Sequence, residues 1–425
     1  MNRTSPRATS LISWVLVGAF AAGSCGDSSQ PGTGTEARSS LARVSSPVVS
    51  AGDAAELAAD NRAFAVDLYQ ALRAGDGNFI YAPASISVAL AMLYGGAAGA
   101  TATEIAQTLH FTLPPERLHP AFDALDLALT APPSNASGFR LSIANAAWGQ
   151  QGYQFLSTYL DLLAQNYGAG MRLVDFATPE PARQQINQWV ADNTDQQITD
   201  LIPSGAIYPD TRLVLTNAVY FNADWETPFN PKSPHGVFHA PSGDIADATM
   251  MSGPENIPLW SGAGFDAAAI PYAGGTTSMV VIVPDAGAFA TFEQSLTGDA
   301  MGAILDGQSA ATPGSLTLPS FKFITKTDLG GTLQALGMQL AFEAGQADLS
   351  GIDGTHDLYV SDVIHQATIA VDEKGTVASA ATAVIVGRAS VALNVLYVDR
   401  PFLFLIRDDA TGAILFQGRV LDPTK

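Results

Sequence analysis

Residues 364–390 read IHQATIAVDEKGTVASAATAVIVGRAS, and this stretch decides the fold. Its first part, 364–371, is extended and apolar, and it ends in the turn-forming sequence DEKG at 372–375. The following residues, 376–386, are all small or β-branched, without charge or proline. Such a segment can form a strand on almost any template, and its small side chains permit entry between existing strands. As a plain loop it would promote β-aggregation.

An ordinary core strand is the alternative interpretation of residues 376–386. A core strand would hold larger apolar side chains, and this segment is longer than the usual strand of about five or six residues. Downstream the chain returns to apolar strand patterns at 393–398, 402–406 and 413–420. The last two are predicted to form a hairpin around the turn at 408–412.

Helical patterns dominate the first half of the chain and strand patterns the second half. We expect helices at 53–74, 85–94, 102–109, 118–129 and 182–195. We expect further strands at 141–148, 211–221, 279–283, 316–323 and 358–371. This order predicts the α+β class, built around a large, mostly antiparallel sheet.

The composition excludes several classes of protein. The 425 residues include 40 acidic and 20 basic ones, giving a net charge of -20, so nucleic-acid binding is not expected. The single cysteine permits neither an internal disulfide nor a cysteine-based zinc site. With 47% hydrophobic residues the chain is not disordered. Beyond the N-terminus, no uncharged apolar run is long enough for a polytopic membrane protein.

The N-terminus predicts export. Arg3 and Arg7 precede the apolar stretch 11–22, as in a secretion signal. Two small residues then precede Cys25, and this arrangement resembles a bacterial lipoprotein signal, in which the cysteine is acylated. Simple cleavage near this point, with Cys25 incidental, is the alternative.

Three regions follow from this interpretation of the N-terminus. We expect a signal peptide at 1–24, a flexible tether rich in Gly, Ser, Thr and Pro at 25–52, and a single domain at 53–425. The predicted location is the cell envelope, through a lipid anchor, or the extracellular space.

Patterns typical of enzymatic sites do not occur in the sequence. It contains no HExxH, GxSxG or Walker motif. Residues 262–267 nearly fit a dinucleotide loop but lack the βαβ context. His235 and His239 are four residues apart, but Pro234 and Gly236 argue against a helix there. We therefore expect neither an enzyme nor a cofactor or metal site.

Several long motifs, in order along about residues 55 to 425, resemble those of the serpins. The region 373–381 is similar to the family's proximal hinge, and 398–406 is similar to its C-terminal signature. Residues 416–423 match its last strand, 78–86 resemble the start of its helix B, and 215–225 resemble the third strand of its sheet A. The hinge residues are Glu373, Gly375, Thr376, Ala378, Ser379, Ala380 and Ala381.

This resemblance implies the serpin fold and a suicide-substrate mechanism. The fold would contain a large sheet A, sheets B and C, about eight or nine helices, and an exposed reactive-centre loop. A serine protease cleaves the loop and forms an acyl-enzyme, and the loop then inserts into sheet A. A strand period of two sends Thr376, Ala378, Ala380 and Thr382 inward, and none is charged or large. This favours an inhibitor over a non-inhibitory binding or carrier serpin.

The resemblance also places the bond that the protease would attack. Counting along the loop as the family does from Glu373 gives Ala389-Ser390. A small Ala389 suits elastase-like or subtilisin-like proteases. A loop one residue shorter would give Arg388-Ala389 and imply a trypsin-like target.

Two polar regions would hold the inserting sheet closed in this family. At the shutter, the matching residues are Ser85, Asn217 and His365, while Ala82 replaces a usual serine. At the breach, near the hinge, Trp225 and Glu373 match. Ser320 replaces the lysine that usually pairs with the glutamate, and Lys322 is the candidate substitute.

The expected partner is a serine protease bound by a monomeric inhibitor. The stretch that matches the family's heparin-binding helix, 113–139, has Arg117 as its sole Lys or Arg. Heparin activation is therefore not expected, and membrane contact is expected through the lipid anchor alone.

Overall fold

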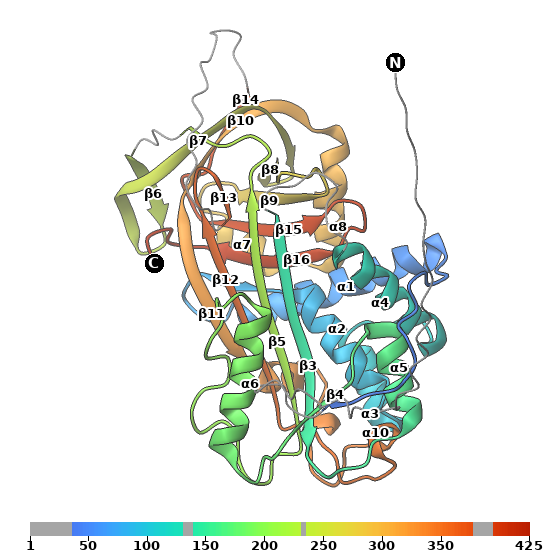
Figure 1. The fold of residues 1–425 in the computed structure, drawn as a ribbon. Coiled ribbons are helices and arrows are strands. Elements are labelled where there is room, and N and C mark those ends of the chain that lie inside the picture. Colours follow the sequence, from blue (N-terminus) through green and yellow to red (C-terminus); the bar gives the residue numbers. More distant parts are fainter. Residues whose placement is uncertain (1–35, 131–138, 231–234, 377–393) are drawn as a thin grey trace, which may run out of the picture. The chain divides into compact units, whose positions relative to one another are not determined.

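The computed structural model describes residues 36–130, 139–230, 235–376 and 394–425. These residues form ten α-helices and two large sheets (Figure 1), one or two helices more than expected. The predicted signal peptide, Cys25, the hinge residues from Ala378 to Ala381, and the alternative reactive bonds at 388–390 lie outside the described residues. No helix in the described ranges has the length and apolar character needed to cross a membrane.

The longer helices come early in the chain, as the sequence pattern predicts. α1 begins where Ser50 Oγ accepts a hydrogen bond from the Asp53 amide at 3.0 Å. α2 is almost entirely buried and begins at Pro83, a residue suited to the first turn of a helix. The α-helices are α1 (Ala51–Leu72), α2 (Pro83–Tyr94), α3 (Gly99–Thr108), α4 (Pro115–Thr130), α5 (Ser157–Tyr167), α6 (Pro179–Asn193), α7 (Phe289–Ser295), α8 (Gly298–Asp306), α9 (Gly330–Ala335) and α10 (Ser350–Asp353).

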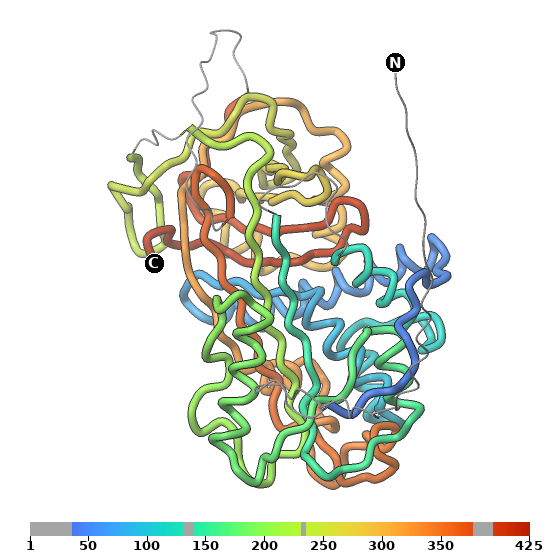
Figure 2. The backbone as a smooth tube through the Cα atoms, in the orientation of Figure 1, coloured from blue at the N-terminus to red at the C-terminus, as the bar shows by residue number. Residues whose placement is uncertain are grey.

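The first sheet, called sheet A here, has seven strands. Their spatial order is β1 (Glu36–Ala37), β4 (Met171–Val174), β3 (Arg140–Gln150), β5 (Leu213–Asp224), β13 (Gly375–Thr376), β12 (Asp362–Val371) and β11 (Phe321–Asp328). The long strands β5 and β12 are parallel and lie side by side (Figure 2). Most other neighbours are antiparallel, except β3 and β4.

The second sheet has nine strands, so the two further sheets that the resemblance implies are continuous here. The spatial order is β14 (Asn394–Tyr397), β10 (Thr312–Pro319), β7 (Gly243–Gly262), β8 (Phe265–Pro271), β9 (Thr277–Pro284), β15 (Phe402–Asp408), β16 (Ile414–Val420) and β2 (Phe79–Tyr81), while β6 (His235–Ala240) pairs with β7 off this path. The predicted hairpin at the C-terminus is β15 and β16.

Alternate residues of sheet A face two separate cores. On one face Ile186 and Val190 of α6 pack with Ile364 of β12. On the other face α2 lies beneath β3 and β5, so their intervening side chains point toward the centre of the molecule. A polar residue on this inner face is therefore buried and must find hydrogen-bond partners.

The strand expected at 316–323 is wrong as a single element. β10 ends at Pro319, and β11 begins at Phe321 in the other sheet. Pro319 cannot donate a ladder hydrogen bond, and the Ser320 amide instead donates to Thr249 O at 2.9 Å. The alternating pattern continues through this break because both strands keep one buried face.

The start of the folded domain also differs from the expectation. The sequence pattern predicts that residues 36–50 belong to a flexible tether, but β1 pairs with β4 and the segment contacts α4 and α5. The segment is rich in Ser, and a strand as short as β1 leaves no apolar period in the sequence, so no local pattern indicates this contact.

Candidate functional site

The seam between β5 and β12 has two different ends. At its lower end the two strands pair directly, from Asp362 opposite Val214 to Ala367 opposite Val219. At its upper end β13 lies between them. Gly375 is opposite Asp224 of β5, and Thr376 is bonded to both neighbours. The first two residues after the 372–374 turn are thus already a strand of sheet A.

A tight turn after β12 sends the chain back into the sheet. The Asp372 side chain accepts hydrogen bonds from the Lys374 amide at 2.8 Å and the Gly375 amide at 3.3 Å. A Cβ atom on Gly375 would lie 2.1 Å from Ala223 O. Only glycine fits at this point, because the backbone of β5 is too close for any side chain.

Thr376 is the first inward-facing residue of the hinge, and it is 1% exposed. Its Oγ1 lies 2.7 Å from the hydroxyl of Tyr272, which is fully buried. The Tyr272 ring stacks on Trp225, with 4.5 Å between centroids and 15° between planes. Burial raises the pKa of Tyr272 well above its usual value, so its hydroxyl stays protonated.

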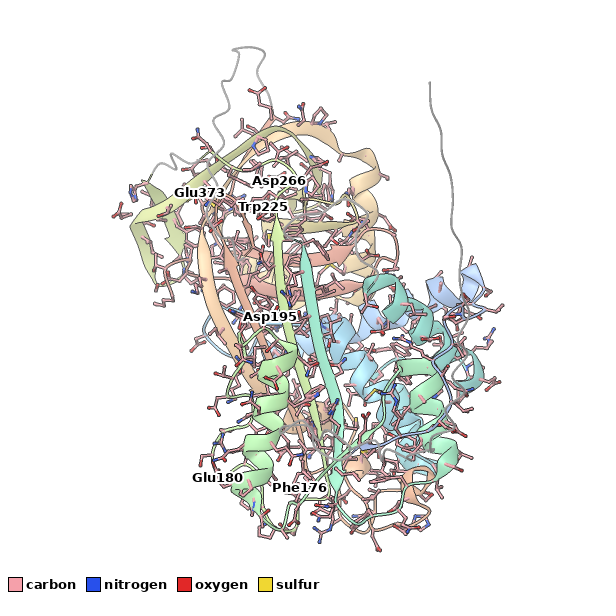
Figure 3. The ribbon with its side chains drawn as sticks, viewed as in Figure 1. Phe176, Glu180, Asp195, Trp225, Asp266 and Glu373 are labelled. Carbon is pink, nitrogen blue, oxygen red and sulfur yellow. The ribbon has the colours of Figure 1, made fainter. Side chains whose placement is uncertain are left out.

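Trp225 and its neighbours hold the turn through its backbone. Trp225 Nε1 donates to Asp372 O at 2.9 Å, and the Trp225 amide donates to Lys374 O at 2.8 Å. The Phe229 amide donates to Glu373 O at 2.7 Å. Three consecutive carbonyls of the turn are therefore satisfied, and Figure 3 shows Trp225 and Glu373 together at the top of the seam.

The structure places Lys322, the candidate substitute for the family's breach lysine, on the strand β11. It is exposed on β11, between the inward-facing Phe321 and Phe323. Ser320 lies at the break between β10 and β11, where its amide is bonded to Thr249.

The lower end of the seam is held by a buried polar cluster, which we call the shutter cluster: Ser85, Asn145, Asn217 and His365. Asn217 Nδ2 donates to Ser85 Oγ at 2.7 Å and to Asn145 Oδ1 at 2.6 Å. Ser85 Oγ in turn donates to Asn145 Oδ1 at 2.9 Å. The cluster joins α2, β3, β5 and β12 across the inner face of sheet A.

His365 completes the shutter cluster as a neutral ring. Its Nε2 accepts a hydrogen bond from the Ala82 amide at 3.2 Å. Its Nδ1 lies 2.6 Å from Asn217 Oδ1, so Nδ1 carries the proton and donates it. Complete burial lowers the pKa of His365 to about 3, although the bond to Asn217 opposes this shift.

Sequence reasoning brought Ser85, Asn217 and His365 together but missed Asn145 and Tyr272. Asn145 interrupts the apolar pattern of 141–148 at an inward position, and its side chain bonds to Ser85 and Asn217. Tyr272 gave no signal, because it follows β8 and meets the hinge only in space. No group of three His, Cys, Asp or Glu suited to a metal occurs in the described ranges.

Comparison with known proteins now identifies the class of protein. The family model described as Serpin (serine protease inhibitor) matches residues 59–423. The chain therefore belongs to the serpin family, whose members are generally inhibitors rather than catalysts.

Relatives that are similar in sequence include proteins named as elastase inhibitors. The chain is 33% identical to horse (Equus caballus) leukocyte elastase inhibitor over 87% of this chain and 100% of that protein. It is 35% identical to a serpin-like protein of Thermococcus kodakarensis, over 85% of this chain and 84% of the relative.

One similar solved structure is the thermophilic serpin tengpin in its native state, with a TM-score of 0.81 and 26% identity over 92% of this chain and 100% of that one. Another is human thyroxine-binding globulin, with a TM-score of 0.78 and 28% identity over 88% of this chain and 100% of that one. Uncleaved ovalbumin is similar too (TM-score 0.76, 26% identity, 87% and 100%).

Proposed function

We propose that this serpin inhibits extracellular serine proteases as a suicide substrate. The protease attacks the loop at Ala389-Ser390 and forms an acyl-enzyme. The cleaved loop then inserts between β5 and β12 and carries the protease with it, before the acyl bond is hydrolysed.

The buried position of Thr376 between β5 and β12 is the single observation that most supports this proposal. Its side chain already occupies the first inward position between β5 and β12, against Tyr272. By the strand period, Ala378, Ala380 and Thr382 are the next inward residues in the sequence, and all are small and uncharged. Continued insertion therefore meets no side chain that is costly to bury.

The energetics favour insertion once the loop is cut. About a dozen new ladder hydrogen bonds at roughly 1 kcal/mol each contribute on the order of 10 kcal/mol, before apolar burial. The uncleaved form is then metastable, and a kinetic barrier keeps it from converting.

The residue before the attacked bond sets the target class. Ala389 suits proteases with small or broad specificity pockets, such as elastase-like and subtilisin-like enzymes. Several relatives carry the name leukocyte elastase inhibitor, which agrees with this choice. Cleavage at Arg388-Ala389 would instead indicate a trypsin-like target.

Export and membrane attachment form part of the same proposal. The signal at 1–24 directs the chain out of the cytoplasm, and acylation of Cys25 anchors it. Cys25→Ser should move the protein from the membrane fraction to the soluble fraction, while Ser24→Ala serves as the matched control. Continued membrane attachment of Cys25→Ser would reject the anchor.

A panel of proteases tests the inhibitory function. Purified protein is mixed with elastase, subtilisin and trypsin, and complexes are sought on denaturing gels. We expect a detergent-stable complex and a released C-terminal peptide that begins at Ser390. A peptide beginning at Ala389 would move the reactive bond to Arg388-Ala389.

A non-inhibitory carrier is the second candidate, because thyroxine-binding globulin and ovalbumin are among the similar structures. The melting temperature before and after loop cleavage separates the two functions. An inhibitor should gain stability as the loop inserts, whereas cleavage without a gain in stability and without any complex would favour the carrier.

A further inference from the structure

Residues 36–50, which we call the N-terminal strap, lie along the outer edge of sheet A. β1 pairs with β4, with Glu36 opposite Arg172 and Ala37 opposite Met171. A Cβ atom on Gly170 would lie 2.7 Å from Ala37 O. The domain thus has a glycine where the backbone of the strap comes closest. This segment precedes the family match, which begins at residue 59.

The strap is also bonded to α5 and the turn that follows it. Its polar contacts there are Arg38 Nη2 to Gly168 O at 2.6 Å, Val44 N to Gln165 O at 2.9 Å, and Ser39 Oγ to Asp161 Oδ1. Together with β1, these bonds join the strap to the part of the molecule that leads directly into β4.

Arg43 joins the strap to a different helix, α4. Its Nε lies 2.7 Å from Asp123 Oδ1, and its Nη2 lies 2.7 Å from Asp126 Oδ2. The Asp123 side chain is 0% exposed, and burial raises its pKa while Arg43 opposes that shift. Asp123 Oδ2 has no hydrogen-bond partner among the described residues. The charge of Arg43 therefore compensates a carboxylate that water does not reach.

The strap thus spans two parts of the molecule that loop insertion would move relative to each other. A new strand between β5 and β12 needs about 4.8 Å of extra width. β3 and β4 are bonded in sequence to β5 on the side away from β12, so they shift with β5. α4 packs on both α1 and α5 and is not part of the sheet, so it does not follow β4 through backbone pairing. Opening the seam would therefore stretch the ion pair between Arg43 and Asp123.

We propose that the N-terminal strap restrains the opening of sheet A, with Arg43 as its latch on α4. This inference rests on the proposed function in one respect: it takes insertion between β5 and β12 as the movement that the strap opposes. The strap slows spontaneous insertion of the uncleaved loop, and its release lowers the barrier.

The test uses the full-length protein with Arg43→Ala and, as a matched control, Arg117→Ala. Arg117 lies on α4 as well, is 50% exposed and pairs with Asp53, outside the strap. The uncleaved proteins are incubated below their unfolding temperature. Conversion to the inserted form is followed as loss of loop cleavage together with a gain in thermal stability.

We expect Arg43→Ala to convert about tenfold faster than the wild type, and Arg117→Ala to convert at the wild-type rate. Arg43→Lys, which keeps the charge without the two-pronged geometry, should fall between them. Equal rates for Arg43→Ala and the wild type would overturn the proposal.

A second measurement separates a restraint from ordinary structural support. The unfolding midpoint is measured for each protein before and after loop cleavage. A restraint on opening should lower the midpoint of the uncleaved form more than that of the cleaved form. An equal loss in both forms would overturn the proposal.

Failure of the inhibitory function would be recognised separately. If no protease forms a complex but Arg43→Ala still lowers the midpoint of the uncleaved form more than that of the cleaved form, the inhibitory function fails and the restraint stands.

Discussion

The two ends of the seam between β5 and β12 differ in how they are closed. At the lower end the strands pair directly, and four polar side chains bond across the inner face. At the upper end β13 already separates the strands, and the side chains there form an aromatic stack, one hydroxyl pair and a bond from Trp225 Nε1 to a backbone carbonyl. One end of the seam thus already holds an additional strand, while a polar cluster closes the other end.

This difference indicates where the barrier to insertion lies. The upper end needs no new opening for Thr376, because it is seated already. At the lower end, insertion would have to break the buried hydrogen bonds of His365 and Asn217. Both ring nitrogens of His365 are hydrogen-bonded, and breaking these bonds where water cannot replace them is costly. The shutter cluster is therefore the main candidate for the kinetic lock.

Thr376→Arg should have the largest effect, at the upper end. A guanidinium cannot be buried against Tyr272 without a partner, so the hinge should leave the seam and the protein should become a substrate. The stoichiometry of inhibition should rise by at least about tenfold, as measured by titration of the protease. Thr376→Ser keeps the hydroxyl and should stay inhibitory; a persistent complex with Thr376→Arg would argue against insertion.

His365→Leu should break the lower end. It leaves the Ala82 amide and Asn217 Oδ1 without partners, at a cost of about 2–4 kcal/mol. The urea midpoint of the uncleaved protein should fall, and spontaneous insertion should become faster. Thr368→Val on the same strand removes a hydroxyl without a hydrogen-bond partner among the described residues, so its midpoint should stay near that of the wild type.

The lower end should also weaken in acid. The folded pKa of His365, about 3, is below its unfolded value of 6.5. Between these values the unfolded chain binds a proton that the native state does not, so this contribution is complete above pH 6.5 and is lost as the pH falls. The loss approaches ~1.4 kcal/mol per pH unit.

Urea unfolding at several pH values measures this loss as the difference between the wild type and His365→Leu. Thr368→Val on the same strand supplies the control, since it removes no titratable group and should leave the pH response unchanged. A pH response that His365→Leu also leaves unchanged would assign the acid sensitivity to other groups, such as His119, whose pKa burial lowers to about 4.

Tyr272→Phe should have the smallest effect. It removes the bond to Thr376 but keeps the stack on Trp225, so the hinge should lose about 1 kcal/mol of docking free energy. Hydrogen exchange at the Thr376 amide reports the change, and Thr376→Val in a double-mutant cycle isolates the pair. Tyr208→Phe, at an exposed tyrosine, should leave the exchange unaltered.

Much of the fold was predictable because long periodic segments carry it. The apolar α2, the strand at 211–221 and the C-terminal hairpin have patterns that tertiary contacts do not override. The break at Pro319 was missed because the alternation of buried residues continues from one sheet into the other. The strap was missed because short segments without an apolar period are held by individual bonds.

The residues of the site also fall into those that the sequence predicts and those that it does not. Ser85, Asn217 and His365 belong to motifs, so the resemblance placed them. Tyr272 and Arg43 act through contacts between segments that are distant in sequence, and no local pattern indicates such contacts. The distance between partners along the chain, more than their chemistry, limits what a sequence alone reveals.

Gly375 has a consequence for the accuracy of insertion. A strand that slips by one residue turns every side chain to the opposite face. If the hinge slipped in this way, a residue with a Cβ atom would take the place of Gly375, 2.1 Å from Ala223 O. The glycine therefore fixes the register in which the hinge enters the sheet. The register in turn determines which side chains of an inserted loop would face inward.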